Sequence, residues 1–182
     1  MTANQQTMHV QTDLPDDLYA AIGMVVVQFS YLEWILNRII YDLMDLDTPA
    51  GRQKILPKQV KERLKLLFRL VGDSGLAVTI DQTALLRHAS EYEGKRDLLC
   101  HAIFVRDQAS TLMVRDAKRG MKWQPPGQRG RAVDKSIEPM GQEIHAAIVV
   151  GLAENIALIN RALEVLWQEI ASQLSNSRHG KI

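Results

Sequence analysis

Apolar residues in the first third of the chain recur at alternating spacings of four and three residues. They are Leu18, Ile22, Val25, Phe29, Leu32, Leu36, Ile39, Leu43 and Leu46. This heptad seam predicts one helix over residues 14–46, about 50 Å long at 1.5 Å per residue, with Asp13 as its N-cap. Val26, Ile35 and Ile40 widen the apolar stripe, so we expect this helix to pack against partners on more than one side.

Three further segments have helical periodicity. A second helix is predicted over residues 57–71. A third is predicted over residues 79–101, because Thr79 and Gln82 have the spacing of a capping box, and a long last helix over residues 136–174. The chain is therefore predicted to be all-α, a bundle of four main helices of which two are long. The second helix also has a basic row opposite its apolar row, made of Lys58, Lys61, Lys65 and Arg69.

The apolar period changes directly after the third predicted helix. Two short runs rich in β-branched and aromatic residues, at residues 103–105 and 111–114, flank a polar turn. This pattern predicts a small β-hairpin insertion over residues 102–123, between the third and last helices. Residues 124–136 are rich in glycine, proline and cations and are expected to form a basic loop.

Composition is that of one soluble domain. The chain has 182 residues, of which 46% are hydrophobic and 24% charged, and no uninterrupted apolar run reaches the length of a membrane span. Residues 1–12 and 175–182 are predicted to be a disordered arm and tail around a single domain at residues 13–174. The start of the chain has no secretory pattern, and Cys100 is the single cysteine, so we expect a cytoplasmic protein without a membrane partner.

Charge is balanced over the whole chain but not locally. The net charge of +1 gives no general attraction to nucleic acid. One segment, however, interleaves cations with a tryptophan, at Arg115, Lys118, Arg119, Lys122, Trp123, Arg129 and Arg131. Such a segment could hold single-stranded RNA through phosphate contacts and base stacking, and the alternative is an ordinary solvated loop.

The end of the third predicted helix carries the residues best suited to chemistry. Asp97 and His101 are four residues apart and share one helix face, so Asp97 is expected to orient His101. A histidine in the last turn lies at the negative end of the helix dipole, which favours its protonated form and suits proton transfer. The alternative is structural: His101 stabilises the helix end, and Arg96 pairs with Glu91 or Glu93 on the surface.

Other candidate residues carry less information. Glu33 lies beside the heptad seam, either as a solvated residue or as a buried contact that supports Arg96. Cys100 is expected to be a small buried residue rather than a nucleophile. The sequence has no glycine-rich phosphate loop, zinc-ligand cluster or nucleophile elbow, so no metal and no cofactor are expected.

The order of these features resembles the HEPN superfamily (higher eukaryote and prokaryote nucleotide-binding domains). Its mark is an arginine followed by a polar residue, with a histidine four to six positions after the arginine, and Arg96, Asp97 and His101 match it residue for residue. Residues 29–33, Phe-Ser-Tyr-Leu-Glu, are also similar to the first-helix pattern of several members. The resemblance covers residues 14–174.

The resemblance implies a metal-independent endoribonuclease of a toxin, antiphage or RNA-processing system. Two protomers would pair so that both motifs line one cleft, and the unbroken seam of the first helix also motivates a homodimer. His101 would be a general acid or base in transferring the ribose 2′-hydroxyl onto the adjacent phosphate, Arg96 would stabilise the phosphorane, and Asp97 would orient His101. RNA would be the substrate, and a protein antitoxin or regulator a further partner.

One departure from the family pattern excludes one mode of control. Many members paired with a nucleotidyltransferase antitoxin have a tyrosine two residues after the histidine, where this chain has Ile103; modification of a tyrosine there is therefore excluded. Two competing interpretations belong to other classes. One is a non-catalytic dimeric helical module that binds RNA or a partner protein, and the other is a bundle that binds a small ligand in an apolar pocket.

Overall fold

The computed structural model describes residues 9–10, 13–44, 59–106, 112–116 and 142–179. This part of the chain is mostly helical and contains four helices. They are α1 (Asp16–Leu43), α3 (Val60–Asp73), α4 (Gln82–His101) and α6 (Ala146–His179). The predicted bundle of four main helices, two of them long, is confirmed.

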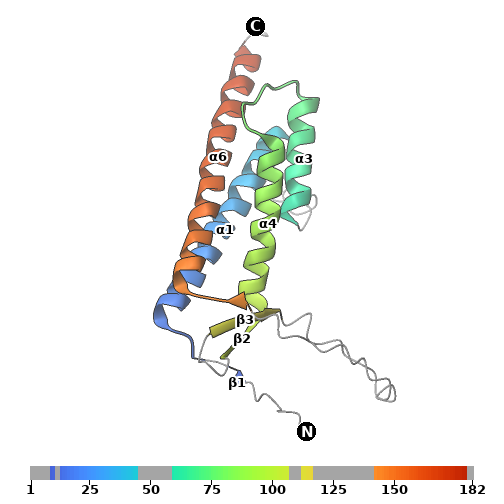
Figure 1. Ribbon diagram of the computed structural model, residues 1–182. Coiled ribbons are helices and arrows are strands. Elements are labelled where there is room, and N and C mark those ends of the chain that lie inside the picture. Colours follow the sequence, from blue (N-terminus) through green and yellow to red (C-terminus); the bar gives the residue numbers. More distant parts are fainter. Residues whose placement is uncertain (1–8, 11–12, 45–58, 107–111, 117–141, 180–182) are drawn as a thin grey trace, which may run out of the picture.

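The two long helices lie side by side and run in the same direction, and α4 and α3 cover one side of the pair (Figure 1). Contacts between α1 and α6 join residues whose numbers increase together along the two helices, as expected for a parallel pair. The Asn160 amide donates to Gln28 Oε1 at 2.9 Å, and the Tyr31 hydroxyl donates to Glu164 Oε1 at 2.8 Å. Helix α6 therefore lies parallel to α1. The chain between these two helices has to return to the end of the bundle where α1 begins.

The heptad seam of α1 forms the centre of the core. Leu18, Val25, Phe29, Leu32, Leu36 and Ile39 are at most 2% exposed. Ile35 and Ile40 are buried as predicted, but Val26 is 41% exposed, so it does not widen the buried stripe. Because the seam is covered by the other helices of the same chain, it is not available to a second copy, and it no longer motivates a dimer.

Several predicted helix ends are corrected by the structure. Helix α1 begins after Pro15 without a side-chain cap, so Asp13 is not its N-cap. Helix α6 begins at Ala146 rather than near residue 136, because Gln142–Glu143 forms a strand before it. Helix α6 also continues through His179, into the segment at residues 175–182 that was predicted as a disordered tail. Serine and arginine tolerate a helical backbone there, and the Ser175 hydroxyl donates to the Ala171 carbonyl at 2.9 Å.

The start of α4 differs from the predicted capping box. The Asp81 carboxylate accepts a hydrogen bond from the Ala84 N–H at 2.9 Å, so Asp81 caps α4. Thr79 instead binds α6: its N–H donates to Glu169 Oε2 at 3.1 Å, and its hydroxyl donates to Glu169 Oε1. Gln173 exchanges two hydrogen bonds with the backbone of Ala77. The connection between α3 and α4 is thereby attached to α6.

These contacts predict that the α3–α4 connection is held less firmly against α6 at low pH. Hydrogen bonds from the Thr79 hydroxyl and then from its N–H lower the pKa of Glu169 below its ordinary value. The stabilisation is therefore present above the ordinary pKa of a glutamate and is lost as the pH falls through the lowered value. We expect Thr79→Val to raise the pKa of Glu169, as measured by NMR titration of its carboxyl carbon. Ser172→Ala is the matched control, because that hydroxyl contacts only the Glu169 backbone; an unchanged titration in Thr79→Val would contradict the assignment.

Four short strands lie at the end of the bundle where α4 ends (Figure 1). They are β1 (His9–Val10), β2 (Ala102–Arg106), β3 (Leu112–Asp116) and β4 (Gln142–Glu143), all antiparallel in that order. Strand β1 lies within the arm at residues 1–12 that was predicted to be disordered; it adds to the open edge of β2, which offers backbone hydrogen bonds. The hairpin insertion over residues 102–123 stays a prediction, since residues 107–111 and 117–123 lie outside the described residues.

Two of the helices are long and apolar enough to cross a membrane, by length and composition alone. They are α1 and residues Ala146–Asn176 of α6. Core helices of soluble proteins have the same property, and in this bundle one side of α1 packs against α3, α4 and α6.

Candidate functional site

The last two turns of α4 carry the three residues of the motif. The Arg96 Nη1 lies 2.9 Å from Asp97 Oδ1, in an ion pair whose side chains are 25% and 44% exposed. His101 is the final residue of the helix and is exposed. Its backbone leads directly into β2, so the histidine lies where the bundle meets the sheet.

Arg96 is anchored by packing as well as by charge. Its guanidinium carbon lies 4.4 Å from the centre of the Phe29 ring, in the range of a cation–π contact. Phe29 belongs to the buried seam of α1, so this contact fixes the end of α4 against the core. Within the described residues the Nε of Arg96 is buried without a hydrogen-bond partner, and an unpaired buried donor costs free energy.

The predicted contact between Asp97 and His101 is not formed. Asp97 pairs with its neighbour Arg96 instead, and no hydrogen bond joins it to His101 in the described part of the chain. An arginine is always charged, whereas a histidine attracts a carboxylate strongly only when it is protonated. Asp97 therefore positions Arg96 in this structure and leaves the imidazole open to solvent.

A contact with Arg96 was one of two alternatives for Glu33, and the structure places Glu33 beside another arginine. Glu33 Oε1 lies 3.5 Å from Arg63 Nη1 of α3, and the same nitrogen donates to Asn37 Oδ1 at 3.1 Å. The Arg63 side chain is 14% exposed, so this is a largely buried polar contact between α1 and α3. The sequence did not lead us to predict a role for Arg63. Its position among the apolar residues of α3 could have indicated that it is partly buried.

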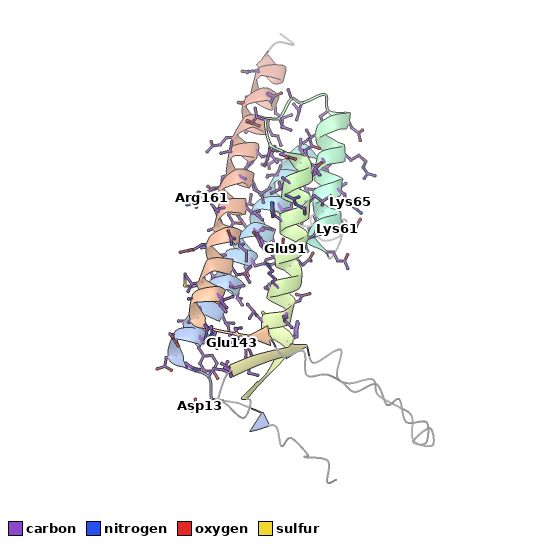
Figure 2. The ribbon with its side chains drawn as sticks, viewed as in Figure 1. Asp13, Lys61, Lys65, Glu91, Glu143 and Arg161 are labelled. Atoms are coloured by element: carbon purple, nitrogen blue, oxygen red, sulfur yellow. The ribbon has the colours of Figure 1, made fainter. Side chains whose placement is uncertain are left out.

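The acidic residues that could have paired with Arg96 have other partners. Glu91 Oε1 lies 2.6 Å from Lys95 Nζ, one turn along α4, and this contact lowers the pKa of Glu91. Glu93 Oε1 accepts the Val60 N–H at 3.0 Å, which caps the first turn of α3. The surface pairing considered for Arg96 is therefore absent from the described residues. Figure 2 shows Glu91 on α4 and two exposed cations of the predicted basic row, Lys61 and Lys65, on α3.

Of the predicted RNA-binding residues, only the first, Arg115, lies within the described part of the chain. The backbone of Arg115 pairs with Ile103 in the β2–β3 ladder, and Ile103 is two residues after His101. The other predicted residues, Lys118, Arg119, Lys122, Trp123, Arg129 and Arg131, lie outside the described residues, as does the predicted basic loop. The basic segment thus begins next to the strand that follows the motif.

Two further findings complete the site. Cys100 is exposed rather than buried as predicted: its neighbour Leu99 enters the core, and adjacent residues of a helix point about 100° apart. Among the described residues, no group of three histidine, cysteine or acidic side chains is placed to hold a metal ion. Comparisons of the chain with protein-family models, curated proteins and solved structures find no match.

Proposed function

We propose that this chain is a metal-independent endoribonuclease of the HEPN type, acting in a toxin, antiphage or RNA-processing system. One observation supports it most directly: Arg96, Asp97 and His101 lie at one helix end, with the arginine held and the histidine exposed. A guanidinium held by both a carboxylate and an aromatic ring is preorganised, and its planar fork of N–H groups suits a phosphate. The unpaired Nε is consistent with a functional rather than a purely structural arginine.

The reaction follows from these groups. The ribose 2′-oxygen attacks the adjacent phosphorus and loses its proton, the bond from phosphorus to the 5′-oxygen breaks, and that oxygen gains a proton. The products are a 2′,3′-cyclic phosphate and a 5′-hydroxyl. His101 moves one of these two protons, and Arg96 offsets the charge that grows on the phosphorane oxygens. Asp97 holds Arg96 in place.

The proposal also includes the partners and place of action. RNA is the substrate, and a hairpin insertion after His101 would carry the basic segment that begins at Arg115 towards the same end of the bundle. The protein acts in the cytoplasm as a homodimer, without a membrane partner, and a protein antitoxin or regulator restrains it.

The test is cleavage of an end-labelled RNA pool in EDTA by the wild-type chain and by His101→Ala. We expect the wild type to cut and His101→Ala to lose cleavage, because His101 is the residue proposed to move a proton in the reaction. Cys100→Ala is the matched control, since Cys100 is the exposed neighbour of His101. Circular dichroism melts of all three exclude unfolding. Equal cutting by the wild type and His101→Ala, or no cutting by the wild type, would contradict the proposal.

A non-catalytic helical module is the second candidate, and one observation favours it. Asp97 contacts Arg96 rather than His101, and Arg96 rests on a buried ring, which are contacts that stabilise helix packing. In that case Arg96→Ala would lower the melting temperature, and His101→Ala would leave RNA binding unchanged. A filter-binding assay with the same RNA pool separates this module from a nuclease.

A further inference from the structure

A second apolar stripe runs along α1 on the side away from the buried seam, and its last two members, Tyr31 and Trp34, also contact Glu164 and Trp167 at the edge of α6. Its members recur at spacings of four and three residues, and we call them the outer seam: Ala20, Met24, Val27, Tyr31 and Trp34. All are exposed, Val27 by 66% and Trp34 by 52%. The helix has no charged residue between Asp17 and Glu33. A continuous exposed apolar stripe of this length is typical of an interaction surface.

The stripe is graded in size from one end to the other. Its first turns present Ala20 and Gly23, and a Cβ added at Gly23 would meet nothing within 4 Å. Its last turns present Tyr31 and Trp34, whose rings are stacked at 5.8 Å. A surface that is small at one end and bulky at the other complements a copy of itself only when the two copies run in opposite directions.

The charged residues at the two ends of the outer seam also favour an antiparallel pair. Asp16 lies at the start of the outer face, and Arg38 continues it one turn beyond Trp34; Arg38 lies 3.5 Å from Asp42 of the same helix, and its side chain is still 39% exposed. In an antiparallel pair each Asp16 lies opposite the partner's Arg38, whereas a parallel pair would oppose like charges. The residue midway between Asp16 and Arg38 is Val27, the most exposed member of the seam.

We infer that two copies of this chain associate through α1, antiparallel, about a two-fold axis next to Val27. Ala20 then lies opposite the partner's Trp34. Gly23 lies opposite the partner's Tyr31. The aromatic rings of each copy occupy the space left by the small residues of the other, and an ion pair between Asp16 and the partner's Arg38 forms at each end. Each of these contacts occurs twice, as an isologous interface requires.

This dimer differs from the shared cleft that the family resemblance implies, and it does not depend on the proposed ribonuclease activity. Arg96 packs on Phe29, which is two residues from Val27 and therefore on the opposite side of α1. The two motifs then face away from each other across the dimer. Each site is built from the residues of one chain.

Sedimentation velocity of the full chain tests the association. We expect a dimer for the wild type and for Lys61→Glu, a charge reversal on the exposed side of α3. Val27→Glu is expected to raise the dissociation constant at least about tenfold, since it buries an unpaired charge at the axis. Asp16→Arg and Arg38→Asp should each weaken the dimer, and the double variant should restore it. A wild-type monomer at about 100 µM, binding of that monomer to phospholipid vesicles instead, or no restoration by the double variant would overturn the inference.

Disulfide trapping tests the direction in a Cys100→Ser background. In an antiparallel pair Val27→Cys should cross-link to itself. Ala20→Cys and Trp34→Cys should cross-link only when the two variants are mixed, because these positions face each other across the interface. Self-cross-linking of Ala20→Cys as rapid as that of Val27→Cys would mean a parallel pair and would overturn the antiparallel assignment.

Discussion

Phe29→Ala is expected to destabilise the protein by about 3–5 kcal/mol, the cost of removing a fully buried aromatic ring and leaving a cavity. Phe29 is 1% exposed at the centre of the heptad seam of α1. The guanidinium carbon of Arg96 also lies 4.4 Å from the centre of the Phe29 ring. The substitution therefore removes the contact that holds the end of α4 against the core, in addition to the buried ring. Urea denaturation followed by circular dichroism measures the loss, with Phe29→Leu as the control that retains most of the volume.

The contribution of the ring to holding Arg96 can be separated from its contribution to packing. A double-mutant cycle of Phe29→Leu with Arg96→Met isolates the pairwise energy. We expect a coupling of about 0.5–2 kcal/mol, because the guanidinium is partly desolvated against the ring. Additive effects of the two substitutions would mean that Arg96 does not interact favourably with the Phe29 face.

The helices were predictable because their apolar period repeats over many turns. Leu18 to Ile39 return to one face at every three or four residues, and that face is the core. The ends were less predictable because a single residue has several competing partners. Thr79 could cap α4 from its spacing, but a contact with Glu169, distant in sequence, takes its hydroxyl. Likewise, the pairing of Gln142 with Val114 moves the start of α6 past the helical pattern around residue 136.

The candidate site was predictable in position but not in its contacts. The spacing of Arg96, Asp97 and His101 on one helix placed all three at its end. Which neighbour Asp97 selects depends on rotamers and on which partner is charged, and neither is read from spacing. The pairing of Glu33 with Arg63 depends on how α1 crosses α3. That crossing is set by tertiary packing, which no local pattern records.

Arg96→Ala is expected to lower the rate of RNA cleavage by about 10²–10³-fold, the usual loss when a group that stabilises developing charge is removed. Arg96→Lys should recover only part of the rate, because a lysine keeps the charge but cannot form the planar pair with Asp97 or present two parallel donors to a phosphate. Single-turnover cleavage at saturating enzyme measures both, so that weaker RNA binding does not contribute.

Asp97→Asn separates the two roles considered for Asp97. If Asp97 acts by holding Arg96, as the 2.9 Å ion pair suggests, its replacement lowers the rate but leaves the pH dependence unchanged, since the residue proposed to move the proton is untouched. If Asp97 acts by orienting and charging His101 when RNA is bound, the same substitution moves the pH profile to lower pH, because the imidazolium loses a stabilising carboxylate. A pH–rate profile of Asp97→Asn therefore decides which neighbour the carboxylate serves during the reaction. The structure favours Arg96, since that is the contact formed before any substrate is present.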